Sequence, residues 1–254
     1  MATTISCSIF KGGAGKTTAA VNLAAALALM NKKVLLVDLD QQANATKYVG
    51  IDPDQVNPSF YHVFQNQVPA SVVINNTDFG FDLLPSSSLM AAIEEALEPG
   101  DEKMLREILL PLKDDYDYVI LDSPPGKAQL AFNAILAADW ILITASAERM
   151  ALDGVADLIR HIQEILWRKY PDELANQEIR ILFTKYKKST SHSPGVVNAA
   201  KRVYRDNVID ILVPETVEFP RSYGKRQPLP IMLPSHPGAI AYRQVAEWII
   251  TNLN

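Results

Sequence analysis

The 254-residue sequence has only one cysteine, Cys7, and therefore cannot form an internal disulfide. This excludes the disulfide-stabilised class of small secreted domains and favours the reducing cytoplasm as the location. No apolar run reaches the length of a membrane span, so no membrane association is expected. The N-terminus also lacks a basic segment followed by an apolar core, which argues against a signal peptide. The four histidines show no metal-ligand spacing.

Acidic charge predominates overall, with a net charge of −5, but the basic residues are concentrated in one region. Residues 180–226 contain ten basic and four acidic side chains, a local net charge of +6. A basic region on an acidic body can steer a polyanion such as DNA to one face. For the basic residues near the end of the helix predicted over 194–204, a solvated helix end is an equally good explanation. The candidate DNA-binding residues are Lys185, Lys187, Lys188, Lys201, Arg202, Arg205, Arg221, Lys225 and Arg226.

A glycine-rich loop at residues 10–18 separates a strand predicted over 3–9 from a helix predicted over 19–30. Glycines lack Cβ, so the backbone N–H groups can approach phosphate oxygens, and the helix N-terminus adds its dipole. Lys16 can reach the β- and γ-phosphates, and the Thr17 hydroxyl can ligate Mg²⁺. The strict phosphate-loop pattern begins with glycine where this chain has Phe10, and Lys11 follows it. The predicted nucleotide-binding loop comprises Lys11, Gly12, Gly13, Ala14, Gly15, Lys16, Thr17 and Thr18.

Carboxylates end two apolar segments that are predicted to be buried parallel strands. Asp38 and Asp40 follow the apolar run 34–37 and are expected to point the same way, since side chains alternate along a strand. Asp122 ends the strand predicted over 118–122, as in a Walker B segment whose carboxylate reaches the Mg²⁺ shell. The alternative is that these aspartates only end their strands and cap the following turns. Open α/β sheets place ligands at this edge, which favours a Mg²⁺ site there.

These stretches resemble the ParA/MinD family of ATPases. The loop K-G-G-A-G-K-T-T is similar to the family's deviant Walker A box, with Lys11 at the signature-lysine position. Residues 38–46 resemble the family stretch D-x-D-P-Q-x-N-x-T with Gln41 in place of proline, and residues 122–125 resemble D-x-P-P. The resemblance extends over nearly the whole chain.

The resemblance implies an α/β fold, a single doubly wound P-loop NTPase domain over residues 1–254 with a mainly parallel twisted sheet and helices on both faces. It implies ATP and Mg²⁺ as cofactors, with Thr17, Asp38 and Asp122 on the metal side. Asp40 would position or activate the attacking water, and Lys11, Lys16 and Asp40 form the expected catalytic set. Glu148, near the dimer interface, and backbone near Pro214, over the adenine, are the further candidate nucleotide contacts.

The resemblance also implies a function: an ATPase, slow without a partner, that positions a plasmid, a chromosome region or a large protein assembly. Two subunits would close over two ATP molecules to form a homodimer that binds non-specific DNA, and a ParB-like or cargo-adaptor protein would activate hydrolysis. The ATP state would be nucleoid-associated. Glu218 stands near a position that is often arginine in relatives, which leaves the DNA contacts open. The cargo is not identified by the sequence.

Two alternatives remain from other functional classes. A MinD-like membrane-cycling ATPase is disfavoured, since only residues 251–254 follow the last predicted helix and they carry no positive charge. The other alternative is a metabolic enzyme with the same loop. Its iron–sulfur version needs paired cysteines across a dimer, which Cys7 inside the first predicted strand cannot supply.

The remaining predicted elements are strands at 79–84, 140–144, 179–184 and 208–213, and helices at 60–64, 89–97 (capped by serines 86–88), 103–112, 127–138, 151–170 and 237–250.

Overall fold

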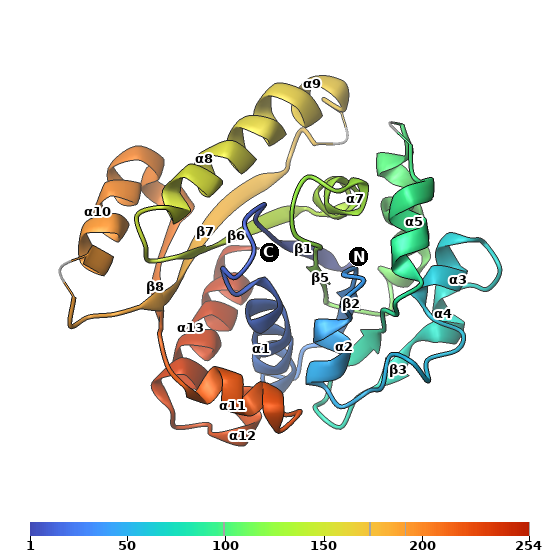
Figure 1. Cartoon of the computed structure of the whole chain (residues 1–254), viewed down its shortest axis with the longest axis horizontal. Coiled ribbons are helices and arrows are strands. Elements are labelled where there is room, and N and C mark those ends of the chain that lie inside the picture. The colour runs from blue at the N-terminus through green and yellow to red at the C-terminus, as the bar shows by residue number, and fades with distance from the viewer. Residues whose placement is uncertain (99, 173, 191, 254) are drawn as a thin grey trace.

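The computed structural model describes residues 1–98, 100–172, 174–190 and 192–253. Within them the chain forms an eight-stranded sheet in the order β3-β4-β2-β5-β1-β6-β7-β8 (Figure 1). Neighbouring strands are parallel except for the antiparallel edge pair β3–β4. The strands are β1 (Thr3–Ser8), β2 (Val34–Asp38), β3 (Asn75–Asn76), β4 (Asp82–Leu84), β5 (Tyr118–Asp122), β6 (Trp140–Ser146), β7 (Glu178–Tyr186) and β8 (Val208–Pro214).

Helices cover both faces of this sheet (Figure 1). The first face carries α1 (Lys16–Leu29), α2 (Asn44–Tyr48), α11 (Glu218–Gly224), α12 (Leu229–Met232) and α13 (Pro237–Asn252). The second face carries α3 (Phe60–Phe64), α4 (Ala70–Val73), α5 (Met90–Ala96), α6 (Met104–Leu109), α7 (Gln129–Ala137), α8 (Ala151–His161) and α10 (His192–Tyr204). The shorter helical segments are η1 (Asp101–Lys103), η2 (Leu110–Leu112), η3 (Ile162–Leu166), α9 (Trp167–Lys169) and η4 (Arg205–Asn207). The predicted doubly wound, mainly parallel α/β fold is therefore confirmed.

Side-chain alternation along the central strands decides which face each residue joins. In β5, Val119 and Leu121 pack into the core on the second face, whereas Ile120 packs into the core on the first. Asp122 has the same parity as Ile120 and so belongs to the α1 face. Asp38 is its register partner in β2, and Cys7 is its partner in β1. The strand register thus brings the two predicted carboxylates together at the carboxyl edge, beside α1.

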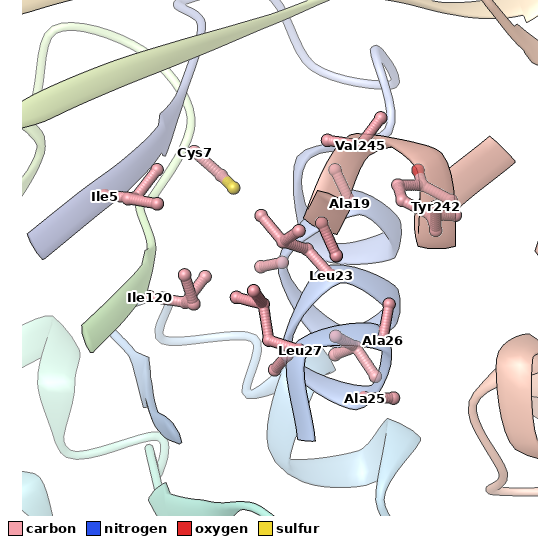
Figure 2. Packing of buried hydrophobic residues seen from close by; sticks show 14 of the residues in the cluster. Ile5, Cys7, Ala19, Leu23, Ala25, Ala26, Leu27, Ile120, Tyr242 and Val245 are labelled. Carbon is pink, nitrogen blue, oxygen red and sulfur yellow. The ribbon is translucent and has the colours of Figure 1, made fainter. Parts of the chain in front are cut away.

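Helix α1 is apolar around most of its circumference because it is sandwiched between the sheet and α13. Figure 2 shows Leu23 and Leu27 facing Ile5 and Ile120 of the sheet, with Val245 of α13 nearby. The alanines at 24–26 are fully buried, and their small side chains allow α13 to approach closely. This packing fixes the N-terminus of α1, where the glycine-rich loop ends.

Most predicted elements are confirmed, and the departures have local causes. Helix α1 contains the helix-forming segment predicted from Ala19 and begins at Lys16, where the anion-binding helix end was expected. The strand predicted over 79–84 retains only Asp82–Leu84. The helix predicted over 103–112 is divided among η1, α6 and η2, with Pro111 inside η2. The helix predicted over 151–170 is interrupted by the π-helical segment η3. The prediction that serines cap α5 was wrong, because Leu89 occupies the N-cap and no side chain caps the helix.

Candidate functional site

The phosphate loop connects β1 to α1 through two residues in the left-handed region. Gly13 has φ of 81° and Gly15 has φ of 83°, conformations that favour glycine. The Ala14 carbonyl between them accepts a hydrogen bond from Thr184 Oγ1 of β7 at 3.0 Å. A Cβ on Gly15 would lie 3.6 Å from Thr184 Oγ1. The loop is therefore shaped by its own glycines and held from β7, a contact that the sequence did not indicate.

Lys16 and Asp122 form the charged centre below this loop. Lys16 is only 8% exposed, and burial lowers the pKa of its ammonium while the carboxylates of Asp122 and Asp40 oppose that shift. Asp122 is fully buried, and among the described residues neither of its carboxylate oxygens has a hydrogen-bond partner of good geometry. Burial raises the pKa of Asp122 well above its usual range, and the neighbouring Asp38 raises it further, whereas the nearby Thr17 hydroxyl and Lys16 lower it.

A buried carboxylate without a well-formed hydrogen bond among the described residues requires a physical explanation, and a hard cation supplies one. Asp122 and the Thr17 hydroxyl present oxygen donors of the type that Mg²⁺ prefers. In the part of the chain that the structure describes, no three His, Cys, Asp or Glu side chains are grouped to hold a metal by themselves. This fits Mg²⁺, which takes one or two carboxylates and completes its shell with waters and substrate phosphates.

Asp38 and Asp40 lie together at the end of β2, but their contacts differ. Asp38 accepts hydrogen bonds from the Thr46 N–H at 2.8 Å, the Thr46 hydroxyl at 2.7 Å and the Asp40 N–H at 3.2 Å. Burial raises the pKa of Asp38 to about 6, although the bonds from Thr46 lower it. Asp40 accepts a hydrogen bond from the Gln42 N–H at 2.9 Å. Asp38 thus organises the loop that carries Asp40, and its role beside the metal stays a prediction.

A cavity of about 480 Å³ opens beside the phosphate loop. Its walls come from the loop and α1, from α2, from the ends of β7 and β8, and from α11 and α13. The lining includes the predicted Pro214 together with Gly15, Thr17, Thr18, Asn44, Tyr48, Thr184, Lys185, Glu215, Thr216, Phe219 and Tyr223. The space is continuous with the loop and has aromatic walls, so it suits a nucleoside attached to phosphates. No helix was predicted over Glu218–Gly224, so the part of the wall that α11 forms was not anticipated.

Lys11 and Glu148, two further predicted residues, lie outside this cavity. Both side chains are exposed. Glu148 lines a separate hollow of about 260 Å³ that shares Lys185 and Glu215 with the larger cavity. Lys11 precedes the loop's glycines, and its Cβ faces Gly154 of α8. Neither position is brought to the nucleotide cavity within one chain, so their predicted roles require a second subunit.

The basic residues do not form one continuous surface. Lys185 lies in the last part of β7, and Lys187 and Lys188 follow its end. Arg221, Lys225 and Arg226 belong to α11 and the turn after it. These six lie toward the carboxyl edge of the sheet. Helix α10 runs from that edge back to the start of β8, which places Lys201, Arg202 and Arg205 at the opposite, amino edge (Figure 1). Three of the nine form ion pairs, namely Lys187 with Glu215, Lys201 with Asp210 and Arg221 with Glu218.

The fold and the site define a P-loop nucleotide-binding protein, and comparisons with known proteins agree. A family profile described as an AAA domain matches residues 2–181. The chromosome-partitioning ATPase Soj of Thermus thermophilus is 35% identical over 96% of this chain and 93% of its own. The crystal structure of cobyrinic acid a,c-diamide synthase from Mycobacterium smegmatis, with bound ATP analog and magnesium, matches with a TM-score of 0.86 at 30% identity, covering 100% of this chain and 96% of that one.

The septum site-determining protein MinD of Pyrococcus horikoshii, complexed with Mg-ADP, matches with a TM-score of 0.83 at 25% identity, covering 100% of this chain and 98% of that one. The chain belongs to the ParA/Soj/MinD family of P-loop ATPases. Within the described residues, no helix combines the length and the apolar character needed to cross a membrane.

Proposed function

We propose that this chain is a ParA-type positioning ATPase that binds ATP with Mg²⁺, closes into a homodimer in that state and then binds DNA without sequence preference. The observation that carries the proposal is the buried Asp122, whose carboxylate oxygens have no hydrogen bond of good geometry among the described residues, close to Lys16 and to Thr17. Thr17 also lines the cavity of about 480 Å³. That arrangement fits a nucleotide–magnesium pair. The named activity of the Thermus relative supports the partition role.

Each residue of the site then has a physical task. The backbone of residues 12–18 and the Lys16 ammonium bind phosphates, and Thr17 with Asp122 would hold the metal. Mg²⁺ neutralises phosphate charge when it is bound. Asp40 orients the attacking water, and Lys11 reaches the phosphates of the second subunit. A cationic group supplied in trans can contribute on the order of a thousandfold in rate, so an isolated subunit turns over slowly.

DNA binding and cargo positioning extend this proposal to the surface. Basic side chains near the cavity mouth, at Lys185, Lys187 and Lys188, offer contacts for phosphates on the same edge as the nucleotide. An activating ParB-like or adaptor protein would then accelerate hydrolysis and release the DNA, and the ATP state would associate with the nucleoid. The cargo is a plasmid, a chromosome region or a large protein assembly.

The test is retention of random-sequence duplex DNA by the purified protein with ATP–Mg²⁺, with ADP–Mg²⁺ and without nucleotide, at low and moderate salt. We expect retention with ATP only, weakening steeply as salt rises because phosphate contacts release counterions. Liposomes of anionic lipid serve as the parallel arm. Binding to liposomes without DNA retention would favour the membrane-cycling alternative, and binding to neither would favour a metabolic enzyme.

A further inference from the structure

A buried hydroxyl group contacts the backbone of Asp40 from a distant part of the chain. Ser86 lies in the loop between β4 and α5, and its side chain is fully buried. Its Oγ donates a hydrogen bond to the Asp40 carbonyl at 2.7 Å, across 46 positions in the sequence. A buried hydroxyl that hydrogen-bonds to the backbone of a candidate catalytic residue can fix the orientation of that residue.

The same serine also closes a ring of hydrogen bonds through Asp38. The Ser86 N–H donates to Thr46 Oγ1 at 3.0 Å, and that hydroxyl donates to Asp38 Oδ2 at 2.7 Å. The other oxygen of Asp38 accepts the Asp40 N–H at 3.2 Å. The ring therefore joins the end of β2, helix α2 and the β4–α5 loop, and every side chain in it is buried.

This ring holds the Asp40 residue at both of its peptide groups. Its N–H donates to Asp38, and its carbonyl accepts hydrogen bonds from the Ser86 hydroxyl and from the Ala43 N–H at 2.8 Å. Ser86 is the distant side chain among these contacts, since Ala43 belongs to the same local turn. The next residue, Gln41, is exposed and has no ring that would restrict the backbone. The hydrogen bonds therefore set the direction of the Asp40 side chain, whose Oδ1 is further held by the Gln42 N–H.

We propose that Ser86 is a positioning residue for Asp40, acting on turnover through the backbone of that aspartate and not through nucleotide binding. The inference rests on the proposed ATPase role of Asp40. Ser86 does not line the nucleotide cavity. Its loss should therefore change the rate of hydrolysis and leave the affinity for ATP unaltered.

The experiment compares kcat, KM and ATP affinity of Ser86→Ala with those of the unmodified protein. We expect kcat to fall by about 10- to 100-fold, the usual effect of removing a contact that supports a catalytic group or of displacing that group slightly. The affinity for ATP should stay within about twofold of that of the unmodified protein. Ser87→Ala is the matched control, because Ser87 is buried in the same loop but bonds to Ser59 Oγ at 3.1 Å and not to Asp40. That control should retain its kcat.

A combined variant distinguishes positioning from general loosening of the fold. In an Asp40→Ala background, Ser86→Ala should cause no further loss of turnover, since the group it orients is gone. Ser86→Cys keeps the shape of the side chain and leaves no cavity, but its thiol is a weaker donor. It should also lower kcat, which covers the case in which the alanine variant fails to fold.

The outcomes separate this inference from the proposed function. Normal turnover in Asp40→Ala would overturn the catalytic assignment of Asp40 itself. Loss of turnover in Asp40→Ala with normal kcat in Ser86→Ala and Ser86→Cys would overturn only the role of Ser86. Weaker ATP binding in the Ser86 variants, or an equal loss in Ser87→Ala, would make Ser86 a structural residue and would also overturn the inference.

Discussion

Lys16 supplies the positive charge at the centre of the site, where burial shields that charge from water and strengthens its attraction for phosphate. It is almost completely buried and lies close to Asp122 and Asp40. Lys16→Ala removes a charge-assisted donor from the phosphate site, an interaction that contributes about 1.5–3 kcal/mol. We therefore expect ATP affinity to fall by at least about 10- to 100-fold, measured by isothermal titration calorimetry with Mg²⁺ present.

The control for this substitution is Lys33→Ala, an exposed lysine at the start of β2, far from the cavity. It should bind ATP as the unmodified protein does. Thermal unfolding without nucleotide checks that Lys16→Ala is folded, because the variant leaves Asp122 buried beside no cation. Tight ATP binding by a folded Lys16→Ala protein would contradict the assignment of the phosphate loop.

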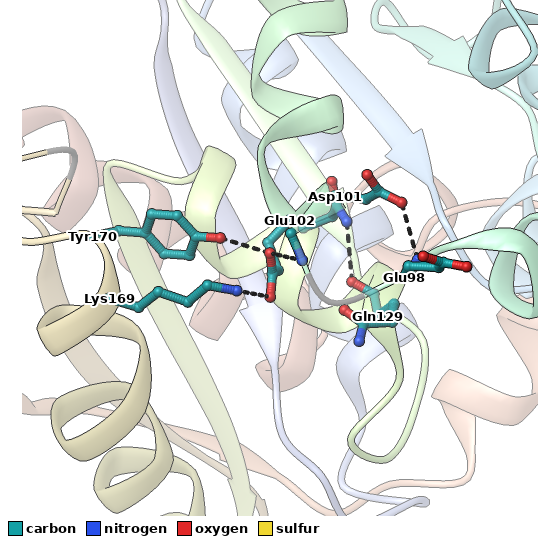
Figure 3. Close-up of polar contacts among 8 residues, drawn as sticks. Glu98, Asp101, Glu102, Gln129, Lys169 and Tyr170 are labelled. Atoms are coloured by element: carbon teal, nitrogen blue, oxygen red, sulfur yellow. Dashed lines mark hydrogen bonds and ion pairs between the residues drawn. The ribbon is translucent and has the colours of Figure 1, made fainter.

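Among the elements, η1 and α9 are joined by one buried carboxylate (Figure 3). Glu102 accepts hydrogen bonds from Lys169 Nζ at 2.8 Å and from the Tyr170 hydroxyl at 2.6 Å. Burial alone would raise the pKa of Glu102, but these bonds and those from the backbone lower it to about 2. Its contribution to stability is therefore complete above the unfolded value of 4.5 and is lost as the pH falls toward 2.

We expect Glu102→Gln to lower the free energy of unfolding by about 1–3 kcal/mol near pH 7, the range for hydrogen bonds to a charged group. The difference from the unmodified protein should shrink near pH 3, as measured by urea unfolding at both pH values. Lys169→Met should cost less than about 1 kcal/mol, because the Lys169 side chain is 42% exposed. An equal cost for both variants, or a pH-independent difference, would contradict this account.

How much of each element could be predicted depended on whether its signal was local. The loop between β1 and α1, and the aspartates that end β2 and β5, carry their pattern within about ten residues and were located correctly. The Ser86 contact spans 46 positions and the Thr184 contact spans 170. Nothing in the neighbouring sequence could indicate either. The serines at 86–88 instead suggested a helix cap, because that residue type is common there.

The long helix predicted over 151–170 shows a second limit. Apolar periodicity indicates a continuous helix, but the π-helical segment Ile162–Leu166 widens the turn without removing the pattern.

The basic region shows a third limit of prediction from the sequence. Ten basic residues between 180 and 226 are neighbours in sequence. The parallel connection through α10 nevertheless separates them, since a crossover must return the chain to the opposite edge of the sheet.

At the scale of the whole molecule, this separation makes the proposed DNA-binding surface testable. Helix α10 has 13 residues, so its two ends are about 20 Å apart. DNA binding that depends on ATP should use the edge that contacts the nucleotide cavity, which Lys185 and Glu215 line. The pair Lys187 and Lys188 lies on that edge, whereas Arg202 and Arg205 lie on the other.

We therefore expect Lys187→Glu with Lys188→Glu to weaken ATP-dependent DNA retention and to reduce the slope of log affinity against log salt by about 2, one for each lost phosphate contact. Arg202→Glu with Arg205→Glu is the matched control, with the same charge change on the opposite edge, and should retain DNA binding. Both variants should still form the ATP dimer, measured by light scattering. If only the Arg202 and Arg205 pair mattered, the DNA-binding surface would lie at the amino edge. An equal loss of DNA retention in both double variants would mean that bound DNA passes along α10 from one edge of the sheet to the other. ATP would then control DNA binding through dimer formation and not through the edge beside the nucleotide.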